Sequence, residues 1–232
     1  MELHLTPRLQ AAVSLIGPDG GVADIGTDHA YLPAALALMG RAGRLVAADL
    51  REGPLARARE TAARYGVTRK LEFCLSDGLE HVSPEGLGWI VICGMGGETI
   101  RGILERAAWL KHSDAVLVLQ PQSKQEELAE WLSHEGWGLC DTAMAKDAGR
   151  IYPLFSVKRK AGGECWGELD VYSALVKKRE PLLREFLEQR LNMYRDALCG
   201  MRRGGEAVKE RAAAMERLIC ALEAIRKETE AW

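Results

Sequence analysis

The sequence lacks the features that would place it in several specialised classes of protein. None of its apolar runs approaches the roughly 18 residues that a membrane-spanning helix needs, so we expect a protein without a membrane partner. Its start, Met1-Glu-Leu-His, carries no basic signal-peptide segment, which favours a cytoplasmic location. A formal net charge of -2 gives no overall signature of nucleic-acid binding. It does not exclude an RNA partner, because a local basic patch can bind RNA.

Cysteine is present but not in a pattern that builds a metal or disulfide framework. The six cysteines form no C-x-x-C pair and have no histidine partners at zinc spacing. Cys74 and Cys93 lie inside apolar runs typical of strands, so we expect reduced, buried thiols. The sequence therefore predicts no metal site.

Two glycines of the dinucleotide-binding fingerprint are also missing. An apolar run from Val22 ends in Asp24, and the chain then turns at Gly26 and continues into an apolar helical pattern, which is typical of a cofactor-binding strand, turn and helix. A pyrophosphate would need glycine at the positions that Asp28 and Tyr31 occupy. The Asp28 carboxylate repels a pyrophosphate but suits a sulfonium cation or an amine, which favours S-adenosylmethionine over NAD. The alternative is that Asp28 only caps the following helix.

Two further acidic residues follow predicted strands. Asp49 ends the second apolar run 23 residues after Gly26 (49 minus 26), a spacing that suits hydrogen bonds to ribose hydroxyl groups. Asp77, followed by Gly78, comes after the third strand. Asp77 could accept a hydrogen bond from the amino group of a cofactor's adenine, or Asp77 and Gly78 could form a plain Asp-Gly turn.

The next two strand ends are rich in glycine and amide groups. The segment Gly94-Met-Gly-Gly97 indicates that the backbone passes close to another group. Gln120, before Pro121, could read a base edge or only precede a strand-ending turn.

The sequence divides into an α/β part and a helical part. From Gly21 to about Lys160, β-rich runs alternate with helical patterns, which predicts a parallel sheet covered on both faces. We expect strands at 22–25, 45–48, 71–75, 89–93, 116–119, 138–143 and 151–157, and helices at 5–16, 54–65 and 124–135. After Gly162 and Gly163 the sequence becomes charge-laced and helical. The predicted domains are therefore 1–160, which binds the cofactor, and 161–232.

The second domain is predicted as an antiparallel helical hairpin. One helix would start at Pro181, glycines at 200, 204 and 205 would break it, and a second helix would run from about 206 to 228. Its charged side chains either form a solvated surface or include a set of cations that bind the phosphates of a folded RNA. The cations considered for that set are Lys177, Lys178, Arg179, Arg184, Arg202 and Arg203.

The four strand-end motifs should converge on one crevice, and together they resemble a known family. Asp24-Ile-Gly-Thr-Asp-His-Ala-Tyr-Leu-Pro33, Gly94-Met-Gly-Gly97, Leu119-Gln-Pro121 and the helical hairpin are similar to the TrmK family of bacterial tRNA (adenine-N1)-methyltransferases, which modify adenosine 22. The likeness spans nearly the whole chain. It implies a Rossmann-like class I methyltransferase sheet that binds S-adenosylmethionine, and a C-terminal coiled coil that helps to hold tRNA.

The resemblance also implies roles for single residues. Asp28 is the catalytic candidate, because its carboxylate could accept a hydrogen bond from the N6 amino group of the target adenine. The cofactor-binding candidates are Asp24, Gly26, Asp28, His29, Asp49, Leu50, Asp77, Gly78, Gly94 and Met95. The substrate-binding candidates are Arg8, Tyr31, Gly96, Gly97, Gln120, Pro121 and Tyr152.

Three positions depart from the family pattern. Gln122 stands where the family commonly has Asn, Pro153 where it usually has Glu, and Asp49 where Glu is often seen. Two other interpretations stay open: a methyltransferase that acts on a small molecule or a protein, and a non-catalytic adaptor that presents a coiled coil. We expect a monomer, with a dimer as the alternative.

Overall fold

The computed structural model describes residues 3–41, 43–160, 165–201 and 206–232, with the backbone alone at 206–208. The chain forms two compact units, Met1–Gly167 and Glu168–Trp232, and each is described by itself. The predicted domain border after Lys160, with Gly162 and Gly163, falls outside the described residues, as do Arg202 and Arg203.

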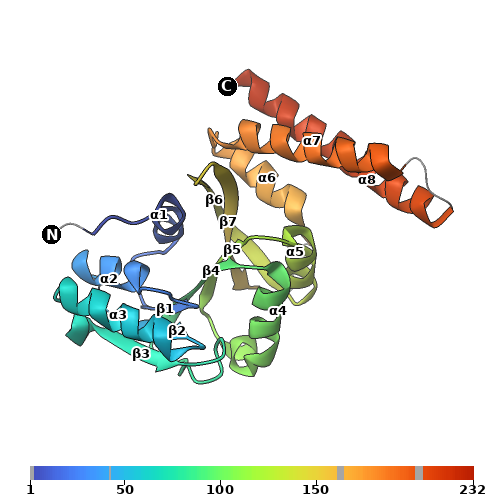
Figure 1. The fold of residues 1–232 in the computed structure, drawn as a ribbon. Helices are drawn as coiled ribbons and strands as arrows, with labels where there is room; N and C mark the ends of the chain where they lie inside the picture. Colours follow the sequence, from blue (N-terminus) through green and yellow to red (C-terminus); the bar gives the residue numbers. More distant parts are fainter. Residues whose placement is uncertain (1–2, 42, 161–164, 202–205) are drawn as a thin grey trace. The chain divides into compact units, whose positions relative to one another are not determined.

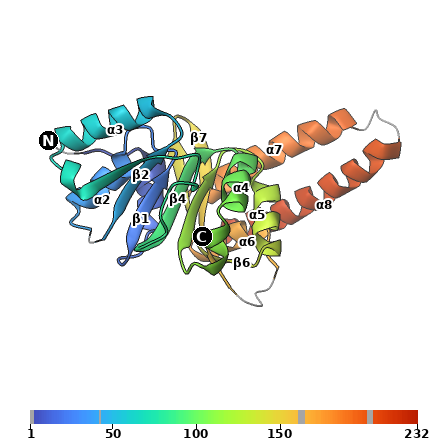
Figure 2. The same ribbon diagram turned by 90° about the horizontal axis from the view of Figure 1, so that it is seen from below.

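The first unit is a seven-stranded sheet with helices on both faces (Figures 1 and 2). Its strands are β1 Gly21–Ile25, β2 Leu45–Asp49, β3 Leu71–Leu75, β4 Leu87–Met95, β5 Val116–Pro121, β6 Trp137–Asp147 and β7 Arg150–Arg159. Its α-helices are α1 Pro7–Ser14, α2 Tyr31–Leu38, α3 Glu52–Arg64, α4 Gly97–Arg106 and α5 Gln125–His134. Each predicted strand and helix of this unit is present, with its ends shifted by a few residues.

The strand order is β3-β2-β1-β4-β5-β7-β6. The chain builds outward from β1 in one direction through β2 and β3, and then returns to the other side of β1 with β4. The carboxyl ends of β1 and β4 therefore lie at the point where the order reverses, which is where open α/β sheets bind ligands. This confirms the predicted Rossmann-like class.

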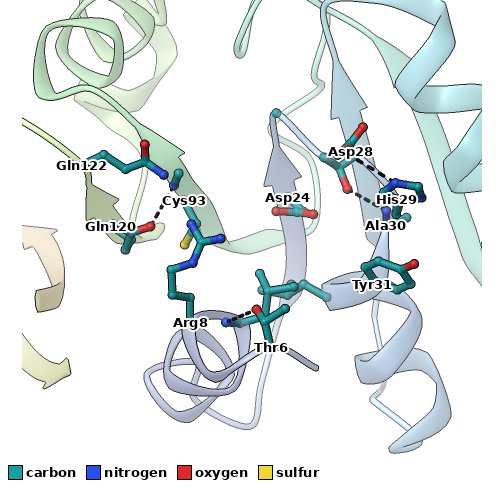
Figure 3. A pocket seen from close by; sticks show the side chains of 15 residues that line it. Thr6, Arg8, Asp24, Asp28, His29, Ala30, Tyr31, Cys93, Gln120 and Gln122 are labelled. Atoms are coloured by element: carbon teal, nitrogen blue, oxygen red, sulfur yellow. Dashed lines mark hydrogen bonds and ion pairs between the residues drawn. The ribbon is translucent and has the colours of Figure 1, made fainter. Parts of the chain in front are cut away.

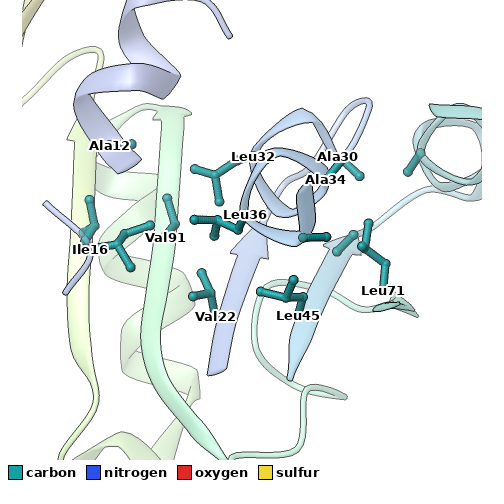
Figure 4. Close-up of a cluster of buried hydrophobic side chains, with 14 of the residues drawn as sticks. Ala12, Ile16, Val22, Ala30, Leu32, Ala34, Leu36, Leu45, Leu71 and Val91 are labelled. Carbon is teal, nitrogen blue, oxygen red and sulfur yellow. The ribbon is translucent and has the colours of Figure 1, made fainter. Parts of the chain in front are cut away.

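One apolar core lies between the sheet and helices α1, α2 and α3 (Figure 4). Leu32 and Leu36 of α2 pack there on Val22 of β1 and Val91 of β4. Since side chains alternate across a strand, the neighbours of Val91 point to the opposite face, which α4 and α5 cover. With both faces buried, the central strands are apolar throughout, and their polar side chains are confined to the strand ends.

The sheet differs from the predicted one in the direction of β7, which runs antiparallel to both β5 and β6. The cause is the connection between β6 and β7, which consists of Ala148 and Gly149, with φ angles of 47° and 77°. Two residues with positive φ form a tight hairpin turn, and a hairpin joins only antiparallel strands. The expectation of a fully parallel sheet was therefore wrong at its last strand.

The second unit contains three helices, α6 Glu168–Lys177, α7 Leu183–Met201 and α8 Glu206–Glu228, followed by a short 3-10 turn. Helices α7 and α8 pack along each other as the hairpin prediction requires, and α6, which was not predicted, packs against both. Helix α7 begins two residues after the predicted start at Pro181, because the amide of Leu183 bonds to the Glu180 carbonyl in a turn.

A buried charge network joins α6 to α7. Glu168, which is only 6% exposed, accepts hydrogen bonds from the Tyr172 hydroxyl and from Arg190 Nη2, the latter at 2.8 Å. Burial and the Glu168 carboxylate raise the pKa of Tyr172 well above its usual value, so that its hydroxyl stays protonated and donates. No helix among the described residues is long and apolar enough to cross a bilayer.

Candidate functional site

Two cavities open at the carboxyl edge of the sheet, and both are lined by Gly26. The first, the Asp24 cavity, has a volume of about 430 Å³; the second, the Asp49 cavity, has a volume of about 350 Å³. The predicted site residues in the Asp24 cavity are Arg8, Asp24, Gly26, Asp28, His29, Tyr31, Gly94 and Gln120. Those in the Asp49 cavity are Gly26, Asp49, Leu50, Asp77, Gly78 and Met95. The predicted residues that line neither cavity are Gly96, Gly97, Pro121 and Tyr152.

Gly26 keeps the backbone between the two cavities free of a side chain. Its φ of 78° lies in the left-handed region, and a Cβ atom there would overlap the Met95 methyl group. Any larger residue would therefore be strained and would displace the Met95 side chain.

Asp24 is the buried carboxylate of the site. It lies at the end of β1, near the centre of the Asp24 cavity (Figure 3), with 8% of its surface exposed. Burial raises its pKa to about 6; a hydrogen bond from the Thr27 side chain opposes this rise, and the charge of Asp49 adds to it. The carboxylate is thus costly to ionise without a cationic partner, which makes it a receptor for positive charge.

Thr27 and Cys93 surround Asp24 and were not predicted as site residues. The Thr27 hydroxyl accepts a hydrogen bond from the Ala30 amide at 3.1 Å, so it ties Asp24 to the start of α2. Burial raises the pKa of the Cys93 thiol far above neutrality, so the sulfur stays protonated and adds no charge. Cys93 precedes the glycine segment in β4, and this position near a strand end was a usable signal.

Asp28 stands in the opposite environment, at the open side of the same cavity. Its carboxylate is 63% exposed, accepts a hydrogen bond from Arg57 Nη2 of α3, and lies 3.4 Å from His29 Nε2. The hydrogen bond with Arg57 lowers the pKa of Asp28, with smaller contributions from the charges of His29 and Arg51. Asp28 does not cap α2, because that helix starts after Ala30 without a side-chain cap. Arg57 lies 29 residues away, and no local pattern indicated it.

Two aromatic rings line the same side of the cavity as Asp28. The rings of His29 and Tyr31 are stacked, with centroids 5.2 Å apart and planes inclined by 16°. A flat ring surface at the edge of a cavity is suited to stacking on a nucleobase.

Arg8 enters the Asp24 cavity from α1. Helix α1 begins at Pro7, and Thr6 caps it by accepting a hydrogen bond from the Leu9 amide. The guanidinium of Arg8 donates from Nε to Asp147 Oδ2 at 2.7 Å and lies over the ring of Tyr152, 5.2 Å from its centroid. Tyr152 therefore holds Arg8 in place, although it does not line a cavity itself.

Gln120 does not have the free amide that the sequence suggested. Its side chain is fully buried, its Oε1 accepts from the Gly94 amide at 3.0 Å, and its Nε2 donates to the Pro121 carbonyl at 3.2 Å. Both ends of the amide are hydrogen-bonded within the protein, so Gln120 fixes the loop after β4. Its contact with a base edge stays a prediction.

The glycines at 96 and 97 serve the packing of the chain itself. A Cβ atom on Gly97 would overlap the Lys124 carbonyl oxygen and come within 2.9 Å of the Ser123 carbonyl oxygen. The Gly97 amide also donates to the Ser123 carbonyl at 2.8 Å. The close neighbour of Gly97 is thus the segment before α5. The substrate contact of Gly96 and Gly97 stays a prediction.

The Asp49 cavity is lined by the acidic residues Asp49, Asp77 and Glu98. Asp49 is buried, and its Oδ1 accepts from the Arg51 amide at 2.8 Å. Asp77 accepts from Arg106 Nη2 of α4 at 2.9 Å, and the exposed side chain of Leu50 adds an apolar surface to the lining. Such a cavity can receive a ribose at one end and a purine at the other. Within the described ranges, no group of three or more His, Cys, Asp or Glu residues is arranged to hold a metal ion.

Comparison with known proteins identifies the kind of domain that carries this site. Residues 5–155 match the family model described as a methyltransferase domain. The tRNA (adenine(22)-N1)-methyltransferase of Bacillus subtilis is 35% identical over 154 residues, which are 66% of this chain and 64% of that protein. The chain thus matches somewhat less than two thirds of that relative's length.

Solved structures show the same fold over nearly the full chain. The crystal structure of the Bacillus subtilis enzyme superposes with a TM-score of 0.81 at 24% identity, and covers 97% of this chain and 100% of its own. A Streptococcus pneumoniae protein described as a tRNA methyltransferase of the same specificity, solved in complex with S-adenosylmethionine, has a TM-score of 0.81 at 25% identity and covers 96% and 100%.

Proposed function

The chain belongs to the methyltransferase domain family, and from this we propose that it transfers the methyl group of S-adenosylmethionine to N1 of adenosine 22 in tRNA. The observation that carries the proposal is the pair of cavities that share Gly26, with Asp24 in one and Asp49 in the other. One cavity fits a cationic ligand end, and the other fits a nucleoside. Of the common cofactors, S-adenosylmethionine combines the two.

The residues present fit this cofactor. Asp24 would hold its amino group, Asp49 its ribose, and Asp77 with Leu50 its adenine. Gly26, which lines both cavities, would lie beside the chain that joins these parts. When bound, S-adenosylmethionine supplies a methyl group on a positively charged sulfur. The buried Asp24 then acquires the positive partner that its environment lacks, which makes binding favourable.

The remainder of the Asp24 cavity is proposed to receive the target base. N1 of adenine carries a lone pair at neutral pH, so the protein need not remove a proton before the transfer, and its main task is alignment. N1 lies on the Watson-Crick edge, so the base must leave its stack. The stacked rings of His29 and Tyr31 offer it a surface, and Arg8 adds a positive charge that suits the RNA backbone.

Asp28 is proposed as the catalytic residue. Because its pKa is lowered by Arg57, it is an ionised carboxylate at every physiological pH and can only accept hydrogen bonds. The N6 amino group of adenine donates, and it becomes a better donor when the ring gains positive charge. An acceptor there orients the base and favours the transition state over the ground state.

The second unit is proposed to bind tRNA through a cluster that we name the basic turn, formed by Lys177, Lys178, Arg179 and Arg184. All four side chains are exposed, and they flank the connection from α6 to α7, where Arg179 takes a φ of 53°. Clustered cations attract the phosphates of a folded RNA without reading sequence. Since the proposed substrate is tRNA, we place the enzyme in the cytoplasm, and we propose that it acts as a monomer.

The proposal is tested by incubating the full-length protein with unmodified tRNA transcript and labelled S-adenosylmethionine, followed by mass analysis of the nucleosides. We expect 1-methyladenosine, and its loss when adenosine 22 is replaced by another nucleotide. Label transferred to a small molecule or a protein, with none in tRNA, would refute the substrate while keeping the cofactor.

A further inference from the structure

The side-chain amide of Gln122 is directed at the Asp24 cavity and is not engaged by the protein. Gln122 is exposed and lines the cavity. Its backbone amide donates to the Met95 carbonyl at 2.8 Å, which fixes the residue against the end of β4. Among the residues that the structure describes, the side-chain amide has no hydrogen-bond partner, so both its donor and its acceptor are available to a ligand.

Gln122 and Arg8 reach the same point of the cavity from different elements. Gln122 Nε2 lies 3.7 Å, and Arg8 Nη1 lies 3.9 Å, from the position that a Cβ atom on Gly94 would take. Figure 3 shows both side chains directed toward this part of β4, on the opposite side of Asp24 from Asp28. Because Gly94 has no side chain, the position that its Cβ atom would take, at van der Waals distance from both groups, is empty of protein atoms.

The two glutamines of this strand end have different tasks. Gln120 is buried and uses both ends of its amide on Gly94 and Pro121. Arg8 offers only donors, because a guanidinium has no acceptor. Gln122 is therefore the side chain at this point that can donate and accept side by side.

We propose that Gln122 binds the Hoogsteen edge of the target adenine, with Nε2 donating to N7 and Oε1 accepting from N6. This inference rests on the proposed function, in which N1 is the methyl acceptor. Because the N1 lone pair must stay free for the methyl group, recognition by paired hydrogen bonds has to use N6 and N7. A glutamine amide matches these two atoms in adenine, whereas guanine presents two acceptors there.

The proposed contact and the proposed role of Asp28 use different hydrogens of the adenine. The N6 amino group has two hydrogens, one beside N1 and one beside N7. Asp28 would accept the first and Gln122 the second, so the base would be held by its amino group on both sides. Gln122 is then a specificity-determining residue that contacts the base and takes no part in the chemical step.

The test uses the full-length protein and two tRNA transcripts, one with adenine and one with 7-deazaadenine at position 22. The second transcript lacks the N7 acceptor but keeps N1 and N6. For the unchanged protein we expect kcat/KM to be roughly 10- to 100-fold lower on the 7-deaza transcript. Gln122→Glu keeps the shape and the acceptor but loses the donor to N7. Its kcat/KM on normal tRNA should be lower than that of the unchanged protein by a similar factor. Its kcat/KM on the 7-deaza transcript should be no lower than on normal tRNA.

Three measurements complete the design. Gln122→Ala should be as insensitive to the 7-deaza change as Gln122→Glu, and calorimetry should show unchanged affinity of both variants for S-adenosylmethionine. The matched control is Gln10→Ala, at an exposed glutamine of α1 outside both cavities. Its kcat/KM should fall on the 7-deaza transcript by the same factor as that of the unchanged protein. Equal 7-deaza effects in the unchanged protein and in Gln122→Glu would overturn this inference alone. Absence of any methylation of normal tRNA would instead overturn the proposed function and this inference with it.

Discussion

At the scale of single residues, the site contains two carboxylates, Asp24 and Asp28, that lie close in sequence but differ in their exposure to solvent. Asp24 is enclosed, and burial raises its pKa to about 6. Asp28 is exposed and bonded to Arg57, which lowers its pKa. Two acids with pKa values moved apart commonly have different tasks. Here, Asp24 is suited to bind a cation and Asp28 to accept a hydrogen bond from the substrate.

The first prediction concerns the pH dependence of cofactor affinity. Asp24 must lose its proton before it can pair with a cationic ligand, and its pKa in the free protein is about 6. Affinity for S-adenosylmethionine should therefore be constant above about pH 6 and fall below it, approaching about tenfold per pH unit. Calorimetry between pH 5 and 7 measures this.

Cys93 and Arg8 do not offer a second explanation for such a profile, and the variant Asp24→Asn separates the effect of Asp24 from that of His29, which lines the same cavity. The Cys93 thiol stays protonated because burial raises its pKa, and Arg8 stays charged. The variant Asp24→Asn should bind weakly at every pH in this range, with a flat profile. A flat profile in the unchanged protein would contradict the assignment of Asp24.

The second prediction separates catalysis from binding at Asp28. Asp28→Ala removes the acceptor for the adenine amino group, so turnover should fall by roughly 100-fold or more. Affinity for S-adenosylmethionine should remain, because Asp24 and Asp49 are unchanged. Single-turnover kinetics and calorimetry measure the two effects.

Arg57 and Asp19 provide the comparison variants. Arg57→Ala should lower turnover less than Asp28→Ala does, because the Asp28 carboxylate remains and only the hydrogen bond that orients it is lost. Asp19→Ala, an exposed acid outside both cavities, should keep full turnover. Normal turnover in Asp28→Ala would exclude it as the catalytic residue.

At the scale of elements, the loops at the carboxyl edge are held by contacts with one another. The loop after β4 is tied to the loop after β5 by the bond from Gly97 to Ser123 and by the bond from Gln122 to Met95. Gln120 adds a third connection through Gly94. The segment that carries Gln122 is therefore fixed before any ligand enters, which lowers the conformational cost of binding.

The third prediction tests this coupling between loops. In Gly97→Ala, the added methyl group would overlap the Lys124 carbonyl oxygen. Because this neighbour is a backbone atom, the overlap can be relieved only if the loop moves. We expect the free energy of unfolding to fall by about 1–3 kcal/mol, measured by urea denaturation. Gly53→Ala in α3 is the matched control, because nothing lies within 4 Å of its Cβ position. It should be neutral or stabilising by up to about 1 kcal/mol. Equal effects in the two variants would show that the loop contact adds nothing.

At the scale of the whole molecule, the chain assigns its proposed tasks to two compact units. The first contains both cavities, and the second contains the basic turn. Trp166 belongs to the first unit, where its amide and its indole nitrogen donate to Ser133 and Trp137. A truncation that is meant to spare the methyltransferase unit should therefore keep Trp166 and end after Gly167.

The fourth prediction concerns the basic turn in the full-length protein. Replacing Lys177, Lys178, Arg179 and Arg184 by Gln should weaken tRNA binding and reduce the salt dependence of the association constant, by up to about 3 units of log-log slope. Affinity for S-adenosylmethionine should not change. Filter binding at several salt concentrations measures the slope.

A control with other cations distinguishes a local effect from a change in overall charge. Arg69 and Lys111 are exposed cations of the first unit, outside both cavities. Replacing them by Gln should leave tRNA affinity nearly unchanged. If the variant without the basic turn binds tRNA normally, the role of the second unit in RNA binding is refuted.

The sequence predicted the elements of this protein well, because their signals are local. Alternation and helical spacing repeat over five to twenty residues, and they located the seven strands together with helices α7 and α8. Helix α6 was missed because it follows directly on a glycine-rich border and shares its charged character with the hairpin. The direction of β7 depended on a two-residue turn whose positive φ values the strand pattern does not encode.

The sequence also predicted several of the residues that reach the cavities from strand ends, although Gly96, Gly97 and Pro121 line neither cavity and Cys93 was missed. Asp24, Asp49 and Asp77 lie in or just after the last residues of β1, β2 and β3, whose carboxyl ends must meet at one edge, so topology alone brings them together. Their tasks as ligands stay predictions. The partnership of Asp28 with Arg57, the closed amide of Gln120 and the open amide of Gln122 were decided only by the tertiary structure. Those features depend on contacts between segments far apart in the chain, and a local pattern carries no information on which distant side chain satisfies a polar group.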